Sequence, residues 1–466
     1  MIKRLKKFRA WLDSRGGLLK MAEPLLNHPV PPRLGWMYVL GSMTLIALVI
    51  QIFTGIALAT MYIPSVSQAY ETLQFLTNED ATGRLLRGMH YWGASAMVLC
   101  VGMHMIQVFL TGAYKYPREL NWISGVILLF LILALGFTGQ LLRWDQNAVW
   151  SVIVGAKQAG KVPVVGDAMA RFILGGENLG GTTLSRFFSI HVFILPATMI
   201  LLLTYHLYLV IRNGISEPPK IGRPVDPQEY KAWYHRLLKE EGVPFWPDPA
   251  WRDLIACAGV IISVALLAWF LGPPELGQPP DPTLVAADPR PDWYLIWYFA
   301  LLALAPPELE NLIIVGAPAL AGIVLLALPL LFNKGERHPL RRPWSVAVVI
   351  LTCLAIATLW VKGQESHWSP DFDTKPLPVA VIGVDSGPAF EGARVFHERG
   401  CQYCHAIDGY GGKRGPDLST IGDRLDAAQL TLRILNGANN MPAYASSLSQ
   451  RDLELLVDFL LTRKTR

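Results

Sequence analysis

Long apolar runs separated by short polar segments fill the first three quarters of the chain. A helix needs about 20 apolar residues to cross a bilayer, and seven runs reach that length. They cover residues 35–63, 88–111, 121–141, 184–211, 253–271, 309–332 and 343–361. A further apolar run, within 289–308, is too short to span and is typical of an interfacial or re-entrant segment. The pattern therefore predicts a membrane protein with seven transmembrane helices.

The pattern changes after about residue 370, where the chain becomes polar and rich in glycine. Residues 449–463 predict an amphipathic helix that closes a small soluble domain. We therefore expect an all-α fold, in which a seven-helix transmembrane bundle carries a small all-α domain. Its expected parts are residues 1–215 with four spanning helices, 216–362 with three, a Pro-rich linker at 363–378 and the soluble domain at 379–466.

Composition agrees with a membrane protein, because 52% of the 466 residues are apolar and only 17% are charged. Residues 1–33 hold eight Lys/Arg against two acids, and the loop at 334–342 is also basic. The positive-inside rule then puts the N-terminus in the cytoplasm, and seven crossings put the C-terminal domain outside. Basic loops can bind nucleic acid, but in a polytopic protein orientation and lipid contact explain them better. No nucleic-acid partner is expected.

Two of the apolar runs carry a pair of histidines. His90 and His104 are fourteen residues apart, and His191 and His206 are fifteen apart. Both intervals are close to four helical turns, so the two histidines of each helix lie near one face, about 21 Å apart along the axis. Polar residues in membrane helices are costly and usually functional. The alternative is that these histidines are hydrogen-bonded inside the bundle and have no functional role. The matching second pair disfavours this alternative.

The second and fourth helices run in the same direction. We therefore expect His90 to face His191 near the outer surface and His104 to face His206 near the inner surface. Haem iron takes two axial imidazoles, whereas zinc needs about four clustered ligands. The two levels of facing imidazoles thus favour two haem groups within the membrane.

Glycines repeat at the same interval on two other helices. Gly41 and Gly55 lie in the first apolar run, and Gly125 and Gly139 lie in the third. Glycine lacks a side chain and lets a flat ring approach the backbone. Close helix packing is the alternative, since glycine is common in membrane helices. The shared interval favours glycines that flank two macrocycles.

The soluble tail contains "CQYCH" at residues 401–405. C-x-x-C-H is the attachment motif for c-type haem, in which Cys401 and Cys404 form thioethers and His405 is an axial ligand. Met441 is the only Met after position 404 and is the candidate sixth ligand. His/Met ligation raises the reduction potential. A redox C-x-x-C and half of a zinc site remain as alternatives.

The short apolar segment begins with "PDWY" at residues 291–294. The Asp292 carboxylate, beside Tyr294 at the membrane surface, can accept a proton from a bound hydroxyl. A turn followed by an interfacial aromatic belt explains the same residues equally well. The residues alone leave both interpretations open.

Over residues 20–362 the chain resembles cytochrome b of the quinol–cytochrome c oxidoreductases, the cytochrome bc complexes. The paired histidines, the paired glycines and "PDWY" fall in the family's order, and "PDWY" looks like a variant of the Pro-Glu-Trp-Tyr quinol-site signature. Other matching stretches are "YPRELNWISG" (116–125), "RWDQNAVW" (143–150) and "HPLRRP" (338–343). The plastoquinol-type branch, which also has seven helices, is the more similar one. The tail resembles a class I cytochrome c domain.

The resemblance assigns roles to two arginines. Arg87 matches an arginine that holds a propionate of the outer haem, and Arg212 matches one at the inner quinone site. Val39 stands where the plastoquinol-type branch has a cysteine that binds a third membrane haem, and Arg143 stands where it has a proline. The resemblance therefore implies two haem b groups and one covalently attached haem c, without an additional covalent haem.

The implied function is a cytochrome b/c fusion subunit of a quinol:cytochrome c oxidoreductase in the bacterial cytoplasmic membrane. Quinol would be oxidised near Asp292 and Tyr294 in a Q-cycle, which generates proton-motive force. One electron would go to a Rieske iron–sulfur protein and the other across the membrane through the b haems, with haem c as the exit carrier. Other implied partners are further bc-complex subunits, a cytochrome c or terminal oxidase, a membrane quinone and a second copy of the complex.

Two alternatives come from other functional classes. The chain could be a di-haem membrane anchor of a quinone-linked dehydrogenase without bifurcation, which "PDWY" and the seven-helix layout disfavour. It could also be a membrane-tethered electron carrier in which only the tail functions, which the four membrane histidines disfavour.

Overall fold

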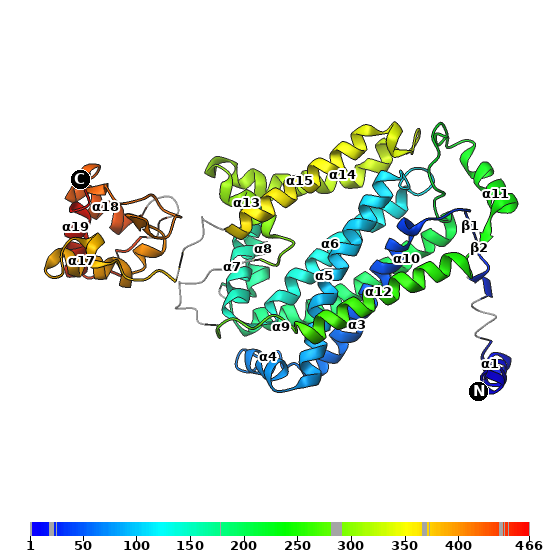
Figure 1. The fold of residues 1–466 in the computed structure, drawn as a ribbon, viewed down its shortest axis with the longest axis horizontal. Coiled ribbons are helices and arrows are strands. Elements are labelled where there is room, and N and C mark those ends of the chain that lie inside the picture. The colour runs from blue at the N-terminus through cyan, green and yellow to red at the C-terminus, as the bar shows by residue number, and fades with distance from the viewer. Residues whose placement is uncertain are drawn as a thin grey trace. The chain divides into compact units, whose positions relative to one another are not determined.

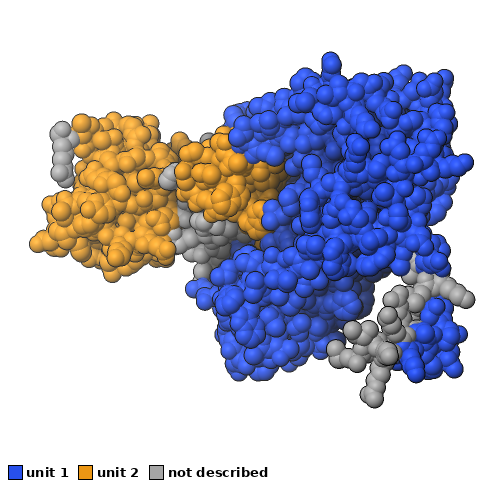
Figure 2. Space-filling model, turned by 45° about the vertical axis from the view of Figure 1, so that its right-hand side comes forward, with its two compact units in different colours: residues 1–281, 306–355 blue, residues 282–305, 356–466 orange. Residues whose placement is uncertain are grey.

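The computed structural model describes residues 2–17, 23–24, 26–177, 179–280, 291–365, 371, 373–437, 441, 443–445 and 447–465. The chain divides into two compact units, residues 1–281 with 306–355 and residues 282–305 with 356–466 (Figure 2). Parts of the predicted linker at 363–378 and the first two residues of the 289–308 segment lie outside the described residues.

All seven predicted membrane spans are confirmed as helices of sufficient length and apolarity (Figure 1). They are η1–α3 (Trp36–Val39, Leu40–Met61), α5 (Ala81–Leu110), α6 (Glu119–Leu141), α9–η2–α10 (Gly181–Ser189, Ile190–Ile194, Leu195–Asn213), α12 (Asp248–Phe270), η4–α14 (Leu312–Gly316, Ala317–Leu331) and α15 (Pro343–Glu365). The second helix begins at Ala81, before the predicted residue 88, because the Asp80 side chain caps a polar first turn by accepting from the Thr82 N–H.

The remaining elements of the larger unit are short. They are α1 (Ile2–Gly16), β1 (Pro29–Val30), α4 (Ala69–Asn78), α7 (Gln146–Gly160), α8 (Gly166–Leu174), α11 (Tyr230–Glu241), β2 (Val243–Pro244), η3 (Pro307–Leu309) and η5 (Pro339–Arg341). β1 and β2 pair antiparallel over two residues. Helix α11 is not among the predicted elements.

The core of the bundle lies where α3, α5, α6, α10 and α12 meet. Its buried members include Ala47, Leu48, Met97, Cys100, Val101, Leu128, Ile132, Met199, Val260 and Val264. Many apolar side chains of the same helices face outward, such as Leu201 at 74% and Phe270 at 75% exposure. Large exposed apolar surface on long helices is what a bilayer covers. The chain is a multi-pass membrane protein.

Two arginines of the basic loop at 334–342 do not contact lipid as predicted. Arg337 and Arg342 are only 2% and 4% exposed, so lipid contact is wrong for these two side chains. Arg342 donates to the Phe109 and Leu110 carbonyls, and Arg337 donates to the Thr111 carbonyl. These carbonyls form the C-terminal end of α5, where the helix dipole attracts cations.

A lysine makes the reciprocal contact. Lys115 Nζ, in the loop after α5, donates to the Phe332 and Lys334 carbonyls beyond α14 at 2.8 and 2.6 Å. Burial lowers the pKa of Lys115 to about 8. The arginines after α14 thus bind the C-terminal end of α5, and the lysine after α5 binds carbonyls beyond the end of α14.

The smaller unit contains α13 (Ile296–Leu304) and the C-terminal domain. That domain is built from α16 (Val379–Ile382), α17 (Pro388–Glu398), η6 (Cys401–Tyr403), β3 (Ala406–Ile407), β4 (Tyr410–Gly411), η7 (Ile421–Asp423), α18 (Ala427–Asn436) and α19 (Gln450–Leu461). The predicted closing helix is confirmed as α19. Phe396 and Phe459 pack in its core with ring centroids 5.9 Å apart. Leu377 joins the same buried cluster.

Candidate functional site

The four predicted histidines lie on two neighbouring spans of the bundle. His90 and His104 are on α5, His191 is in η2, and His206 is on α10. The rings of His90 and His191 have centroids 6.3 Å apart and planes 79° apart, and His104 and His206 are close enough to interact electrostatically. The gap between the first pair leaves room for a metal atom bonded to both rings at about 2 Å, the usual metal–imidazole length.

A π-helical turn explains why the second pair has one residue more than the first. At about 100° per residue, fourteen residues fall roughly 40° short of four turns, and fifteen overshoot by roughly 60°. The turn at Ile190–Ile194, which contains His191, is π-helical. A π-bulge absorbs one additional residue and often occurs at functional sites. His191 and His206 therefore keep the same phase as His90 and His104.

Three of the four imidazoles are oriented by hydroxyl groups. The Nδ1 atom lies 2.9 Å from Thr54 Oγ1 in His90, 3.0 Å from Thr138 Oγ1 in His191 and 2.9 Å from Ser124 Oγ in His206. Each hydroxyl donates its own proton to the carbonyl four residues earlier, at Ile50, Ala134 and Leu120 respectively. The hydroxyl oxygen therefore accepts from Nδ1–H, which leaves the Nε2 lone pair free to bind a metal. Sequence reasoning missed these hydroxyls.

Each predicted glycine faces one of the histidines. A Cβ would lie 3.2 Å from His90 Cε1 at Gly55, 2.7 Å from His191 Cε1 at Gly139, 3.4 Å from His104 Cε1 at Gly41 and 3.5 Å from His206 Cε1 at Gly125. At all four positions the neighbours are imidazole atoms, not the backbone of another helix. Gly88, by contrast, packs against Ala268 of α12. The four glycines thus make space at the histidine sites.

These residues fit a haem held between two imidazoles at each level. The donor set is a pair of imidazoles, three of the four rings present Nε2, and glycine leaves the ring edges open. Among the residues that the structure describes, no group of three or more His, Cys, Asp and Glu is placed to hold a metal ion. A zinc cluster therefore has no support.

Two arginines lie near the outer pair. Arg87, one turn before His90, is 7% exposed and donates to Thr77 Oγ1 at 2.7 Å. Arg143 is close enough to Arg87 for their charges to interact, and it pairs with the fully buried Asp145 at 2.8 Å. Arg87 is thus a buried cation beside the outer histidine pair, as an arginine at a haem propionate would be.

Arg212, the arginine predicted for the inner quinone site, is exposed at the end of α10. It donates to Tyr208 Oη at 3.0 Å. The structure brings it together with neither histidine pair.

The "PDWY" residues form a small hydrogen-bonded unit. Tyr294 Oη donates to Asp292 Oδ2 at 3.1 Å, and Trp360 of α15 donates to the Trp293 carbonyl at 2.9 Å. The structure therefore joins the two predicted catalytic side chains, and a phenol bonded to a carboxylate can pass on a proton.

The C-x-x-C-H motif lies against the core of the C-terminal domain. His405 Nδ1 lies 2.9 Å from the Pro416 carbonyl, so Nδ1–H donates and Nε2 is free to bind iron. Cys401 and Met441 pack against the same core cluster. Cys401 and Cys404 are free thiols, and burial raises the pKa of Cys401 to about 12. The four predicted residues suit a covalently attached haem.

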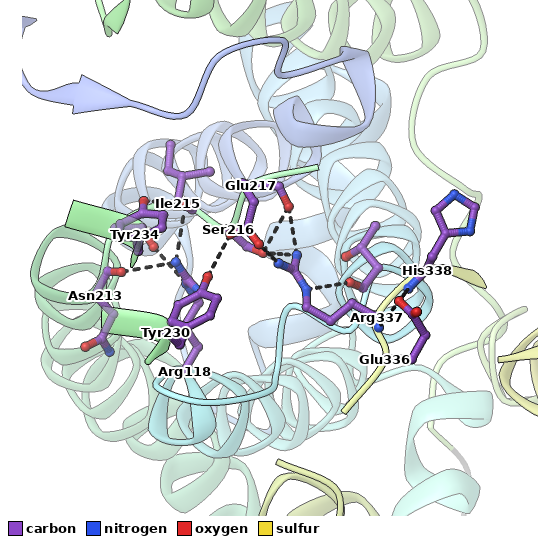
Figure 3. Close-up of polar contacts among 12 residues, drawn as sticks. Arg118, Asn213, Ile215, Ser216, Glu217, Tyr230, Tyr234, Glu336, Arg337 and His338 are labelled. Carbon is purple, nitrogen blue, oxygen red and sulfur yellow. Dashed lines mark hydrogen bonds and ion pairs between the residues drawn. The ribbon is translucent and has the colours of Figure 1, made fainter. Parts of the chain in front are cut away.

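Sequence reasoning also missed a buried polar cluster, drawn in Figure 3. Arg118 donates to Tyr230 Oη at 2.7 Å, Tyr230 donates to Glu217 at 2.7 Å, and Arg337 pairs with Glu217. Burial would lower the pKa of Arg118, but Tyr230, Tyr234 and Glu217 hold it above its usual value. The cluster fastens the chain after α10 to α11 and to the 334–342 loop. No sequence signal marked Glu217, which directly precedes Pro218 and Pro219.

Three family models match the chain. Residues 25–214 match cytochrome b/b6/petB, and residues 279–372 match cytochrome b(C-terminal)/b6/petD. Residues 388–460 match cytochrome C oxidase, cbb3-type, subunit III.

Similar proteins agree with these matches. The menaquinol:cytochrome c reductase cytochrome b subunit of Geobacillus thermodenitrificans is 40% identical over 46% of this chain and 99% of its own length. Cytochrome b6 of Heliobacterium mobile is 43% identical over 45% of this chain and 99% of its own length. A chain of a hyperthermophilic respiratory Complex III is 28% identical, covers 76% of this chain and 91% of its own length, and superposes with a TM-score of 0.63.

Proposed function

The chain belongs to the cytochrome b family and carries a C-terminal cytochrome c domain, and from this premise we propose that it catalyses quinol oxidation in a Q-cycle with a Rieske iron–sulfur partner. The single observation that carries the proposal is the pairing of imidazoles from two spans at two levels of one bundle. A protein that only tethered the soluble domain would have no use for them.

The membrane histidines would hold two haem b groups, and His405 with Met441 would hold haem c on the thioethers of Cys401 and Cys404. When bound, these groups supply one-electron carriers on the two sides of the membrane, so the two electrons of a quinol can take separate routes. The chain's own part is to orient the imidazoles: Thr54 and Thr138 fix the outer pair, and Ser124 fixes His206.

Asp292 and Tyr294 would serve the outer quinol site. The Asp292 carboxylate accepts a proton from the quinol hydroxyl, and its bond from Tyr294 holds it in place. Arg87 would neutralise a haem propionate near His90. Arg212 would lie at the inner quinone site, where its exposed guanidinium can meet a polar quinone head group.

The proposed setting is a bacterial cytoplasmic membrane, with the N-terminus in the cytoplasm and the cytochrome c domain on the periplasmic side. Proton release on that side would build proton-motive force. The partners would be a Rieske protein, other subunits of the complex, a second copy of the assembly and a cytochrome c or terminal oxidase. Menaquinol is the substrate named for the Geobacillus relative, and a menaquinol analogue is therefore the first substrate to test.

The test is isolation of the intact complex from native membranes. We expect a Rieske subunit in the purified assembly, b-type and c-type haem spectra, and reduction of a soluble cytochrome c by the menaquinol analogue. A flavin-containing dehydrogenase subunit in place of the Rieske protein would support the membrane-anchor alternative. A spectrum with haem c and no haem b would reduce the chain to a tethered carrier.

A further inference from the structure

The four membrane histidines differ in what their Nδ1 atoms contact. Thr54, Ser124 and Thr138 accept from His90, His206 and His191 at 2.9 to 3.0 Å. Nδ1 of His104 is buried and has no hydrogen-bond partner among the residues that the structure describes. The outer pair thus has two oriented imidazoles and the inner pair has one.

The sequence accounts for this difference at a single position. Each orienting hydroxyl belongs to the residue directly before the glycine that faces the same histidine. Thr54 precedes Gly55, Ser124 precedes Gly125 and Thr138 precedes Gly139. At the fourth site Gly41 faces His104, and the residue before it is Leu40. Leucine has no acceptor, and the nearby Thr44 hydroxyl is bonded to the Leu40 carbonyl at 2.9 Å.

A hydrogen bond from the distal N–H of a metal-bound imidazole makes it a more basic ligand. A more basic ligand stabilises ferric iron relative to ferrous iron and lowers the reduction potential, since second-shell hydrogen bonds tune haem potentials. An imidazole without that bond is the weaker donor. His104 and His206 would therefore contribute unequally to the inner haem.

We propose that residue 40 is a positioning residue that sets the reduction potential of the inner haem. Because residue 40 is leucine, His104 lacks the hydroxyl partner that the other three histidines have. This rests on the proposed function, because it requires haem between His104 and His206. The missing bond favours reduction at the inner pair relative to a pair with both bonds. Leu40 thus raises the reduction potential of the inner haem, whereas Ser124 lowers it.

The experiment uses the full chain in its purified complex and begins with a haem count by pyridine haemochrome. Redox titration of the b-haem absorption bands then compares Leu40→Ser, Leu40→Ala and Ser124→Ala with wild type. Ser124→Ala should raise the midpoint potential of one b component, which identifies the inner haem. Leu40→Ser should lower the potential of that same component and leave the other unchanged. Leu40→Ala, which shortens the side chain without adding a hydroxyl, controls for packing.

Each outcome bears on one of the two claims. Absence of b haem from the wild-type complex would overturn the proposed function itself. Full haem content with no shift in Leu40→Ser, or the same shift in Leu40→Ala, would overturn the inference and leave the proposed function standing. If Leu40→Ser does not assemble, Thr54→Val carries the test on the outer haem, where loss of the bond must raise the potential of the other component. An unchanged midpoint potential in Ser124→Ala, or in Thr54→Val, would also overturn the inference.

Discussion

At the scale of single residues, the position of a proton decides what each side chain can do. Tyr294 Oη donates to Asp292 Oδ2 at 3.1 Å, which holds the Asp292 carboxylate in position. Oxidation of a quinol releases two protons, so an acceptor must be within reach of the hydroxyl. Aspartate is one methylene shorter than the glutamate of the signature that "PDWY" resembles, and a water molecule can cover the difference.

Asp292→Asn should slow the reduction of both b and c haems by a quinol analogue, because the amide keeps the size and polarity but cannot accept the proton. General-base assistance is worth roughly 100- to 10,000-fold, and a water path would reduce the loss. Stopped-flow reduction of the purified complex, with its Rieske partner present, measures the rate. Tyr294→Phe is the matched control and should slow it less, because the carboxylate remains. Wild-type rates in Asp292→Asn from about pH 5 to about pH 9 would remove Asp292 from the mechanism.

Met441→Ala should leave haem c attached, because the thioethers to Cys401 and Cys404 remain. Loss of the sulfur ligand should lower the potential and abolish the weak near-infrared sulfur–iron band. His397→Gln is the control and should keep the band, because His397 Nδ1 is already 3.2 Å from Gln402 Oε1 within the domain. An unchanged band in Met441→Ala would show that another group is the sixth ligand.

At the scale of elements, charged side chains fasten the loops to the helix ends. Glu217 and Arg337 form an ion pair whose side chains are only 12% and 3% exposed. Glu217→Gln should lower the free energy of unfolding by roughly 3–5 kcal/mol, because Arg337 is left buried without its counter-charge. Glu310→Gln is the control: its pair with Lys161 is much more exposed, so the change should be under about 1 kcal/mol. Thermal unfolding of the complex measures both, and equal effects would contradict the role of the buried pair.

Several features of these elements could be predicted from the sequence because one physical rule dominates each. Hydropathy alone located the seven spans, and helical periodicity brought the histidine pairs together. The π-turn at Ile190–Ile194 could not be predicted, since hydropathy does not register the phase of a helix. The burial of Arg337 and Arg342 was also missed, because a basic loop has the same sequence pattern whether it meets lipid or a helix end. The hydroxyls at Thr54, Ser124 and Thr138 carried a readable signal, because a Ser or Thr directly precedes three of the four paired glycines.

At the scale of the whole molecule, one polypeptide joins regions that match three separate family models. A covalent fusion fixes the ratio of its parts, so the two histidine pairs of the membrane bundle always accompany one C-x-x-C-H motif. Position 39, where a third membrane haem would need a thiol, is a buried valine. The other cysteines, Cys100, Cys257 and Cys353, lie on α5, α12 and α15, and Cys257 Sγ donates to the Ser42 carbonyl at 3.4 Å.

The chain should therefore bind two haem b groups for each haem c. A pyridine haemochrome assay of the purified complex measures the two types separately, because covalent attachment changes the haem vinyl groups and shifts the absorption band. We expect a b:c ratio of two to one, after correction for any c haem in partner subunits identified by mass spectrometry. Cys401→Ser with Cys404→Ser is the control: it should abolish haem c and leave haem b unchanged, since the membrane ligands are histidines. A ratio near one to one would reveal a second covalent haem, and residual haem c in the double variant would show that it is attached outside the "CQYCH" motif.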